Sequence, residues 1–440
     1  AFSYQKGQYE QAANNEPLNT QYERASGIVK LTHQSDSLTT TFSWLPSYGQ
    51  DIGKSNVRFP EHATSDCPTE IHSLAQVQVS SSAGWLAKLF HHYQNWDNTT
   101  ERFGRYTSLS QYQSHTLGGQ WLQAFNHNTL NSVVGIDWLA REGVSISNEY
   151  DHVNNHLQGS ENNVALYSTN TWHWGKAHVN LGLRYDWLQQ SGRNAGLLAD
   201  AALLVDAEHS LAAEYLKTTQ SDANLSASLS FSFPINNTLD IGLDIANGFR
   251  YPTLSERFFN GPTPRGLLQG NTGLKPEKSL RSQLSLNWLA SHTLKLHGAM
   301  YYYDLENYIE RYRVNEELRT FRNQDDSKIY GIEAELEWQT STKTTHFLSY
   351  QQQWGKNAQD ERLNDLSPPT LSWKALVAFN TISFANAVNY YFNTDKVGPS
   401  ETPRNSYAIW NASIDYLWSD DVSLRLAINN ITDKNYYANL

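Results

Sequence analysis

The residues whose types and spacing could do chemistry gather in one segment, 250–278, which is rich in Pro, Gly and Arg. Arginine presents a planar fork of donors that suits carboxylate and catecholate oxygens, and aromatic rings stack on flat ligands. The segment is locally basic in an acidic chain, so it predicts contacts with an anionic ligand. Its cations are Arg250, Arg257, Arg265, Lys275 and Lys278, its carboxylates are Glu256 and Glu277, and its rings are Tyr251, Phe258 and Phe259.

Two amphipathic strands are expected to flank this segment. Residues 239–246 alternate Leu or Ile with Asp, Gly and Ala, and residues 280–288 alternate apolar with polar side chains. A period of two marks a strand with one apolar and one polar face. Residues 330–338 repeat the pattern, with three glutamates on one face and an apolar band that has an aromatic residue at each end of the other. Such a band is typical of a lipid-facing strand whose opposite face lines a wet lumen.

The connections between the expected strands alternate between short and long. Short turns on one side and longer loops on the other are typical of up-and-down outer-membrane barrels, and ten short turns predict about 19–21 strands. Residues 195–219 allow either a hairpin or a partly helical insertion, and the first twenty residues are ambiguous. The short turns are expected at 34–36, 81–84, 126–129, 175–176, 206–209, 236–238, 290–292, 340–344, 380–381 and 419–421, and the long connections at 47–70, 97–106, 147–162, 251–278, 311–328, 354–369 and 394–404.

The composition supports a membrane location. Only 18% of the 440 residues are charged, whereas 12% are aromatic, with 14 Trp and 25 Tyr. Rings with an apolar body and a polar tip collect at membrane interfaces. The net charge of -11 argues against a general nucleic-acid binder. No apolar run approaches the roughly 18 residues of a membrane-spanning helix. The single cysteine, Cys67, is expected as an unpaired thiol in a polar loop, 62–71, without metal-ligand spacing.

A soluble all-β protein is the competing interpretation, because sandwiches and propellers also show period-two strands. The mean hydropathy of -0.59 agrees with it, but a wet lumen and long loops dilute hydropathy in a barrel as well. The length of the strands, their aromatic ends and the alternation of connections favour an all-β, large antiparallel up-and-down transmembrane β-barrel.

Four stretches resemble the motifs of the TonB-dependent outer-membrane receptors. Residues 247–258 (NGFRYPTLSERF) and 270–279 (GNTGLKPEKS) are similar to the paired boxes of that family. Residues 329–338 (IYGIEAELEW) look like its Gly-Ile/Val-Glu strand, and residues 429–436 (NNITDKNY) look like a motif near its C terminus. The order and spacing also match, so the resemblance covers nearly the whole chain.

The resemblance implies that residues 1–440 are a receptor β-barrel domain of the 22-stranded type, without the plug domain and without the last strand. Missing strands would leave open edges, which lipid does not tolerate. The 440 residues alone are therefore not expected to form a competent transporter. Uptake of ligand by cells that express only this stretch would contradict that expectation.

The family's function implies a receptor in the bacterial outer membrane that takes up a scarce nutrient with energy supplied through TonB. The expected partners are TonB, through the missing N-terminal region, the surrounding lipid and lipopolysaccharide, and a small ligand, with no nucleic acid. No cofactor and no metal site are expected. An enzyme is the rival class, but the chain has no G-x-S-x-G elbow, no H-E-x-x-H and no phosphate loop. A passive porin, the other rival, would not predict the paired boxes.

Among the family's ligands, a ferric siderophore is the default. The family's haem receptors typically carry a His between the boxes, and residues 251–271 have none. Copper favours soft ligands, and the chain has one Met and one Cys. Cobalamin and haem stay open as alternatives.

Not every cation of the first segment is an equal candidate. Arg250 and Arg257 lie in a box that members with different ligands share, which favours a role in stabilising the base of the loop. Arg265, in the turn PTPRG, is the better ligand candidate. The ligand-binding hypothesis names Arg250, Tyr251, Arg257, Phe258 and Arg265.

Overall fold

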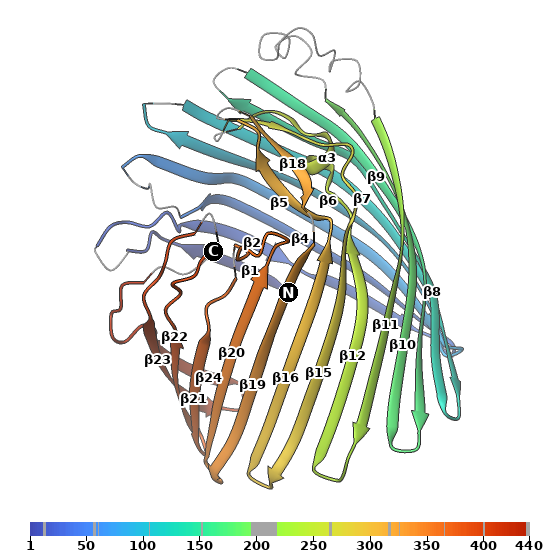
Figure 1. The fold of residues 1–440 in the computed structure, drawn as a ribbon, viewed down its shortest axis with the longest axis vertical. Coiled ribbons are helices and arrows are strands. Elements are labelled where there is room, and N and C mark those ends of the chain that lie inside the picture. Colours follow the sequence, from blue (N-terminus) through green and yellow to red (C-terminus); the bar gives the residue numbers. More distant parts are fainter. Residues whose placement is uncertain are drawn as a thin grey trace.

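The computed structural model describes residues 1–11, 15–55, 59, 61–104, 106–150, 153–194, 218–263, 266–315, 318–324, 326–364, 366–398 and 401–436. Twenty strands of this part of the chain form one large sheet, which curls around a central space (Figure 1). They are β1 (Phe2–Gly7), β2 (Tyr22–Gly27), β3 (Val29–Gln34), β4 (Leu38–Gly53), β5 (Ala63–Ser81), β6 (Trp85–Arg102), β7 (Tyr106–His127), β8 (Leu130–Tyr150), β9 (Val153–Trp174), β10 (Ala177–Asn194), β11 (Thr218–Pro234), β12 (Leu239–Arg250), β15 (Glu277–Ser291), β16 (Leu294–Glu306), β19 (Ser327–Ser341), β20 (Thr344–Lys356), β21 (Thr370–Phe379), β22 (Ile382–Tyr391), β23 (Tyr407–Ser419) and β24 (Val422–Ile428).

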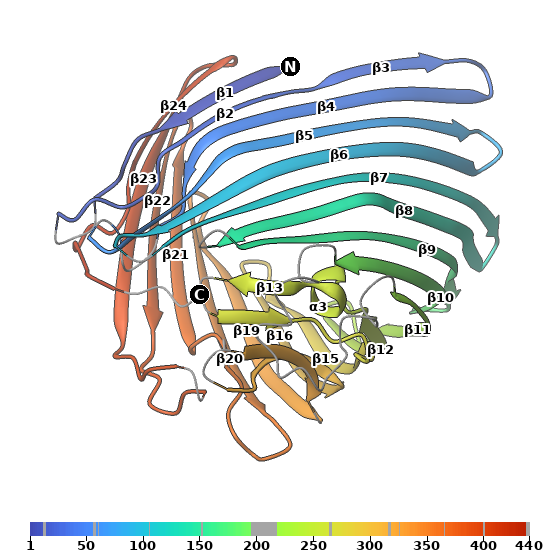
Figure 2. The same cartoon turned by 90° about the horizontal axis from the view of Figure 1, so that it is seen from above.

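Consecutive strands of the large sheet pair antiparallel from β4 to β24, as the alternation of turns predicts. At the other edge, β2 and β3 both pair with β4, at residues 47–50 and 39–44, so they form one interrupted strand. Counted in that way the sheet has 19 strands, and the predicted barrel of about 19–21 strands is confirmed. Within the described residues no hydrogen-bonded ladder joins β24 to β1 or β3. Figure 2 shows the curvature of the large sheet from above.

The short turns lie where the sequence predicts them, except that the turn expected at 206–209 and most of residues 195–219 fall outside the described residues. Three of the connections predicted to be long are wrong in extent. Residues 47–70, 97–106 and 147–162 are mostly strand, because β4 to β9 run on well past their apolar stretches. A ladder that continues into water keeps its hydrogen bonds while both faces become polar, so the hydrophobic alternation that marks a strand disappears.

Cys67 is also placed differently from the expectation. It lies in strand β5 rather than in a polar loop, it is 6% exposed, and its thiol donates to the carbonyl oxygen of Thr69 at 3.4 Å.

The two faces of β19 show how the sheet separates lipid from lumen. Tyr330, Ile332 and Trp338 share the outward face and are exposed on the isolated chain. Glu333, Glu335 and Glu337 share the inward face, where Glu337 pairs with Lys295 of β16 at 3.0 Å. An apolar outward band and a polar lumen are the arrangement that lipid selects in a barrel. In the described part of the chain, no helix combines the length and the apolar character needed to cross a membrane.

Candidate functional site

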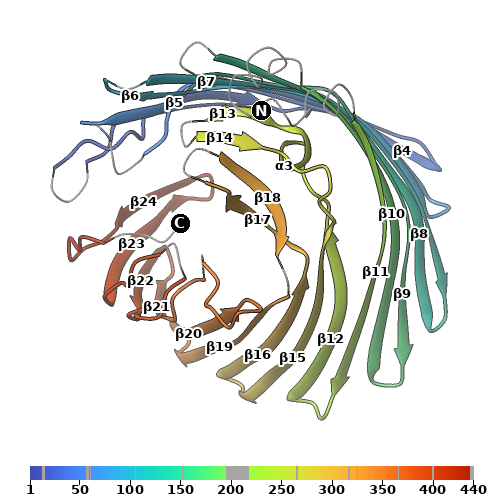
Figure 3. The same ribbon diagram turned by 45° about the horizontal axis from the view of Figure 1, so that its top comes forward.

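Two connections fold back into the space that the large sheet encloses. The first, between β12 and β15, carries the short helix α3 (Leu254–Phe258) and strands β13 (Asn260–Thr263) and β14 (Gly266–Gln269). The second, between β16 and β19, carries β17 (Tyr308–Arg313) and β18 (Leu318–Gln324). Parallel pairing of β14 with β18 joins them into one four-stranded sheet, in the order β13-β14-β18-β17 (Figure 3). The paired sequence boxes therefore begin and end a structured inner body rather than an irregular loop.

Helix α3 begins at a capping box. The Glu256 amide donates to Thr253 Oγ1 at 3.2 Å, and the Thr253 amide donates to the Glu256 carboxylate at 2.7 Å. Such a box satisfies two free amides at a helix start. The helix buries Leu254 and Phe258 against Val144 of β8 and other apolar side chains. Phe258 is only 3% exposed, so its ring holds α3 to the wall.

Tyr251 precedes the helix and points into the wall as well. Its hydroxyl donates to the carbonyl oxygen of Asp186 on β10 at 3.2 Å. Burial raises the pKa of the Tyr251 phenol above its usual value, so it acts as a neutral donor at physiological pH. This contact fixes the point at which the chain leaves β12.

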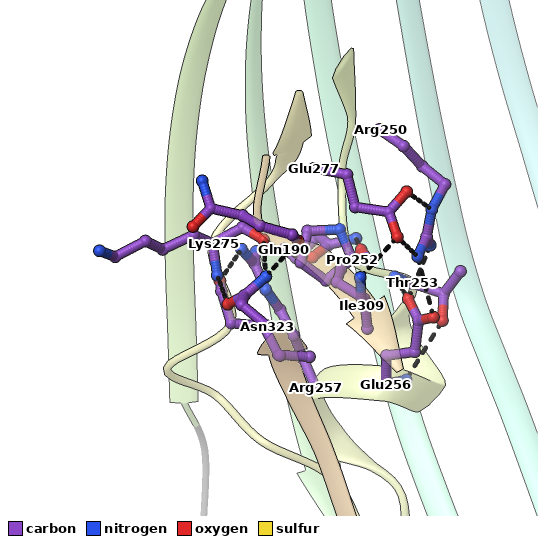
Figure 4. Close-up of polar contacts among 12 residues, drawn as sticks. Gln190, Arg250, Pro252, Thr253, Glu256, Arg257, Lys275, Glu277, Ile309 and Asn323 are labelled. Carbon is purple, nitrogen blue, oxygen red and sulfur yellow. Dashed lines mark hydrogen bonds and ion pairs between the residues drawn. The ribbon is translucent and has the colours of Figure 1, made fainter. Parts of the chain in front are cut away.

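Arg250 lies at the centre of an ion-pair cluster (Figure 4). Its guanidinium donates to both oxygens of Glu277, at 2.7 and 2.8 Å, and to both oxygens of Glu256, at 2.9 and 3.2 Å. Glu277 also accepts the amide of Ile309 at 2.7 Å. Bidentate pairs fix orientation as well as distance. Arg250 therefore ties together β12, α3, β15 and β17.

Arg257 is the largest fully buried side chain of the described residues, with 1% of its surface exposed. Its terminal nitrogens donate to Gln190 Oε1 at 2.8 Å, to Asp222 Oδ2 at 2.6 Å and to the carbonyl oxygen of Leu274 at 3.0 Å. Gln190 in turn donates to the carbonyl oxygen of Pro252 at 3.0 Å. A buried charge persists only when it is paired and hydrogen-bonded. Here that pairing joins the loop to β10 and β11.

The second box ties the two connections together. The Asn323 side chain donates to the carbonyl oxygens of Lys275, at 3.0 Å, and Asn307, at 2.7 Å, and accepts the Lys275 amide at 2.9 Å. Asn271 donates to the carbonyl oxygen of Phe321 at 2.9 Å. Asn271 of the box and Asn323 of β18 thus each satisfy backbone groups of the neighbouring connection.

Replacement of Asn323 by alanine is expected to loosen the inner sheet. The substitution removes three hydrogen bonds and leaves backbone groups of Lys275 and Asn307 without a partner. The free energy of unfolding should fall by about 1–3 kcal/mol. Limited proteolysis of the full-length protein in detergent should cut the connections 251–278 and 307–327 faster than in the wild type. Asn315→Ala, in the same hairpin but away from Lys275, is the control. Equal cleavage rates in both variants would contradict the role assigned to Asn323.

The structure thus brings four of the five predicted site residues into one anchor. Arg250, Tyr251, Arg257 and Phe258 are engaged by protein groups, which is the arrangement that a structural role requires. Arg265 lies outside the described residues. The ligand-binding role of the five residues stays a prediction.

A large cavity opens beside this anchor. It has a volume of about 1580 Å³ and lies between the β17–β18 hairpin, the connections after β20 and β22, and residues 434–436. More cations than carboxylates line it, and three tyrosines add flat polar rings. The cations are Arg311, Arg322, Arg362, Arg404 and Lys434, the carboxylates are Glu310, Glu361 and Glu401, and the rings are Tyr308, Tyr407 and Tyr436.

The cavity's groups differ in how far the protein already uses them. Arg322 is paired with Glu310 at 2.6 Å and lies 3.9 Å above the Tyr312 ring. Arg362 has a buried Nε without a hydrogen-bond partner. Tyr407 stacks on Tyr391 at 4.7 Å and on Tyr436 at 5.2 Å, which produces an aromatic ladder at the cavity's edge. Arginine side chains and tyrosine rings that line one cavity suit a flat anionic ligand.

Sequence reasoning missed most of this lining. Its residues come from connections far apart in the chain, which local sequence patterns do not bring together. The one usable signal was the 429–436 motif, which contains Lys434 and Tyr436. Within the described residues, no group of three or more His, Cys, Asp or Glu side chains is arranged to hold a metal ion.

Comparison with known proteins decides the family. The family model described as "TonB dependent receptor-like, beta-barrel" matches residues 2–431. The chain belongs to the TonB-dependent receptor family. Such receptors lie in the outer membrane of Gram-negative bacteria, which confirms the predicted location.

Individual relatives of this receptor barrel are distant. It is 21% identical over 352 residues to the vitamin B12 transporter BtuB of Vibrio cholerae, a match that covers 78% of this chain and 49% of BtuB. The chain thus spans about half the length of the relatives that it matches. Its fold resembles the copper transporter OprC, with a TM-score of 0.82, 14% identity and coverage of 100% of this chain and 72% of OprC. It also resembles the ferric-catecholate import receptor Fiu of E. coli, with a TM-score of 0.69, 12% identity and coverage of 98% and 73%.

Membership of this family orients the receptor barrel. The short turns of outer-membrane barrels face the periplasm and the longer connections face the outside. The inner sheet and the large cavity are formed by the longer connections. The cavity therefore opens at the extracellular end.

Proposed function

We propose that this barrel belongs to an active transporter that takes up a ferric siderophore, with energy supplied through TonB. The observation that supports this best is the extracellular cavity, whose cations outnumber its carboxylates and whose rim carries stacked tyrosines. Siderophore chelates of ferric iron present carboxylate or catecholate oxygens, which arginine forks bind well. The function is transport rather than catalysis, and the ligand passes through the lumen when TonB remodels the plug.

Cobalamin is the second candidate, because vitamin B12 transporters are among the sequence relatives of this chain. A cobalamin site would depend mainly on neutral hydrogen-bonding groups, whereas this cavity is rich in charge. The siderophore is therefore favoured.

Growth of a deletion strain tests the proposal. The strain is complemented with the full-length gene and grown under iron limitation with catecholate, hydroxamate and carboxylate siderophores, haem, and, in a vitamin-dependent background, cobalamin. Rescue by one siderophore class is the expected result. Rescue only by cobalamin or haem would show that the proposed ligand is wrong and that the proposed transport function is right. No rescue by any of these compounds would favour a passive channel.

Arg265→Ala in the full-length protein is expected to weaken uptake at limiting ligand without changing membrane insertion. The prediction follows from the position of Arg265 in a Pro-Gly turn between the two boxes. Uptake of the labelled ferric siderophore measures the effect, and the amount of protein in the outer membrane is the control. Unchanged uptake would remove Arg265 from the ligand site.

A further inference from the structure

Two histidines of neighbouring strands lie side by side on the lumen wall. Val77 of β5 and Leu89 of β6 are directly opposite each other, and both are exposed on the outward, lipid-facing side. Because side chains alternate along a strand, His72 of β5 and His92 of β6 lie on the other face, toward the lumen. Their rings have centroids 5.5 Å apart and an angle of 18° between the planes, and His72 Nδ1 is 3.3 Å from His92 Nε2. Two ring nitrogens from two strands therefore meet at one point of the wall.

A carboxylate determines which nitrogen of His72 carries the proton. Glu70 Oε1 lies 3.1 Å from His72 Nε2. An ionised carboxylate only accepts hydrogen bonds, so Nε2 carries the ring proton and donates it to Glu70. Nδ1 of the neutral ring then has an unprotonated lone pair on the side of His92. A carboxylate placed behind an imidazole in this way is the usual outer partner of a metal-binding histidine, because it fixes the tautomer and makes the ligating nitrogen more basic.

The charges around the two histidines balance. Arg24 donates to the second oxygen of Glu70, Oε2, at 2.9 Å. Arg141, which acts electrostatically on His92, is paired with Glu161 at 3.2 Å. Each arginine near the histidines is thus opposed by a carboxylate. A cation bound between the two rings would therefore not meet a wall of net positive charge.

The separation of the two nitrogens indicates which metal fits. Zinc–nitrogen bonds measure about 2.0–2.1 Å, and at the tetrahedral angle two such bonds place their nitrogens about 3.3–3.4 Å apart. Square-planar copper(II), with similar bonds at right angles, places neighbouring nitrogens about 2.9 Å apart. The observed distance of 3.3 Å matches the tetrahedral arrangement.

We propose that His72 Nδ1 and His92 Nε2 bind one zinc ion on the lumen wall, with Glu70 as the outer carboxylate. His92 offers Nε2 when its ring proton lies on Nδ1. Within the described residues no third His, Cys, Asp or Glu side chain completes the site, so water occupies the remaining positions on the lumen side. The site is separate from the large cavity, whose lining contains neither histidine. The inference does not depend on which ligand the receptor transports.

Zinc binding to the purified full-length protein, prepared without a histidine tag, tests the proposal. Isothermal titration calorimetry measures stoichiometry and the dissociation constant, and the absorption of bound cobalt(II) reports tetrahedral coordination. The variants H72Q and H92Q each remove one ligand, and E70Q keeps both imidazoles but changes the outer partner. Unchanged heat-modifiable migration in electrophoresis shows that each variant is folded.

The matched control is the variant H173Q/H178Q. His173 of β9 and His178 of β10 are directly opposite each other, with their Nδ1 atoms 2.9 Å apart. Asn131, not a carboxylate, contacts the other nitrogen of His173, at 3.4 Å. This pair therefore has two imidazoles on neighbouring strands but lacks the outer carboxylate and the tetrahedral separation.

The variants H72Q and H92Q are each expected to raise the dissociation constant for zinc by about tenfold or more and to remove the tetrahedral cobalt absorption, and E70Q should raise it about tenfold. The control should bind zinc as the wild type does. Equal zinc affinity in the wild type and H72Q would overturn the proposal, as would a wild type that binds no zinc. An equal loss in H173Q/H178Q would also overturn it, because that result indicates general binding of zinc to histidines.

Discussion

Replacement of Arg257 by methionine is expected to destabilise the protein by about 3–5 kcal/mol, the largest stability effect that the structure predicts for a single side chain. Methionine fills part of the volume, but Asp222 keeps its charge without its partner, and Gln190 and the carbonyl of Leu274 lose a donor. Gln190 is 1% exposed, so water cannot replace the bond that it loses, and the Asp222 side chain, at 18% exposed, is solvated only in part. The inner body should then separate from β10 and β11.

Guanidinium-induced unfolding of the full-length protein in detergent measures this effect. The control is Arg322→Gln, whose ion pair with Glu310 is about half exposed, at 49% for the arginine side chain, and should contribute about 1 kcal/mol or less. The variant R257M/D222N should be less unstable than the two single changes predict together, because it removes the unpaired carboxylate charge. Equal guanidinium midpoints of unfolding for R257M and R322Q would show that the buried Arg257–Asp222 pair does not hold the 251–278 connection to the barrel wall.

The fold was predictable because it follows from local patterns. Alternation such as that of residues 330–338 specifies one strand and its two faces, and short polar turns specify the antiparallel neighbour. The limits of the prediction have a physical cause too. Strands β4 to β9 continue beyond the membrane, where no apolar face is needed, so their outer parts looked like loops.

The site was less predictable than the fold because its residues are brought together only by tertiary structure. The sequence favours a structural role for Arg257 at the base of the loop, but it does not identify the partners Gln190 and Asp222, which lie on strands far from Arg257 in the sequence. Nothing local distinguishes an arginine that points to water from one that is buried against a distant carboxylate. For the same reason the sequence does not mark Arg362 and Arg404, which lie in ordinary polar connections, or Tyr407, which begins β23.

The second large effect is expected at the cavity. The variant R362Q/R404Q should raise the dissociation constant for an anionic ferric siderophore about a hundredfold, since hydrogen bonds to charged groups contribute about 1.5 kcal/mol or more each. Both residues line the cavity, and Arg362 has a buried nitrogen that the described residues leave without a partner. Binding of labelled ligand to energy-depleted cells measures affinity separately from transport.

The control is Arg313→Gln, in the β17–β18 hairpin at the same mouth but outside the cavity lining, where its Nε donates to the carbonyl oxygen of Asn315 at 3.0 Å. It removes one positive charge where R362Q/R404Q removes two, so general electrostatic steering alone would cost R313Q about half as much binding free energy. A loss of that size in R313Q would therefore mean that the cavity attracts the anion by its overall charge and not by direct contacts. Undiminished binding in R362Q/R404Q would remove these two arginines from the ligand site. A loss confined to R362Q/R404Q would identify the cavity as the place where the anion is held before TonB acts, because energy-depleted cells bind ligand without transporting it.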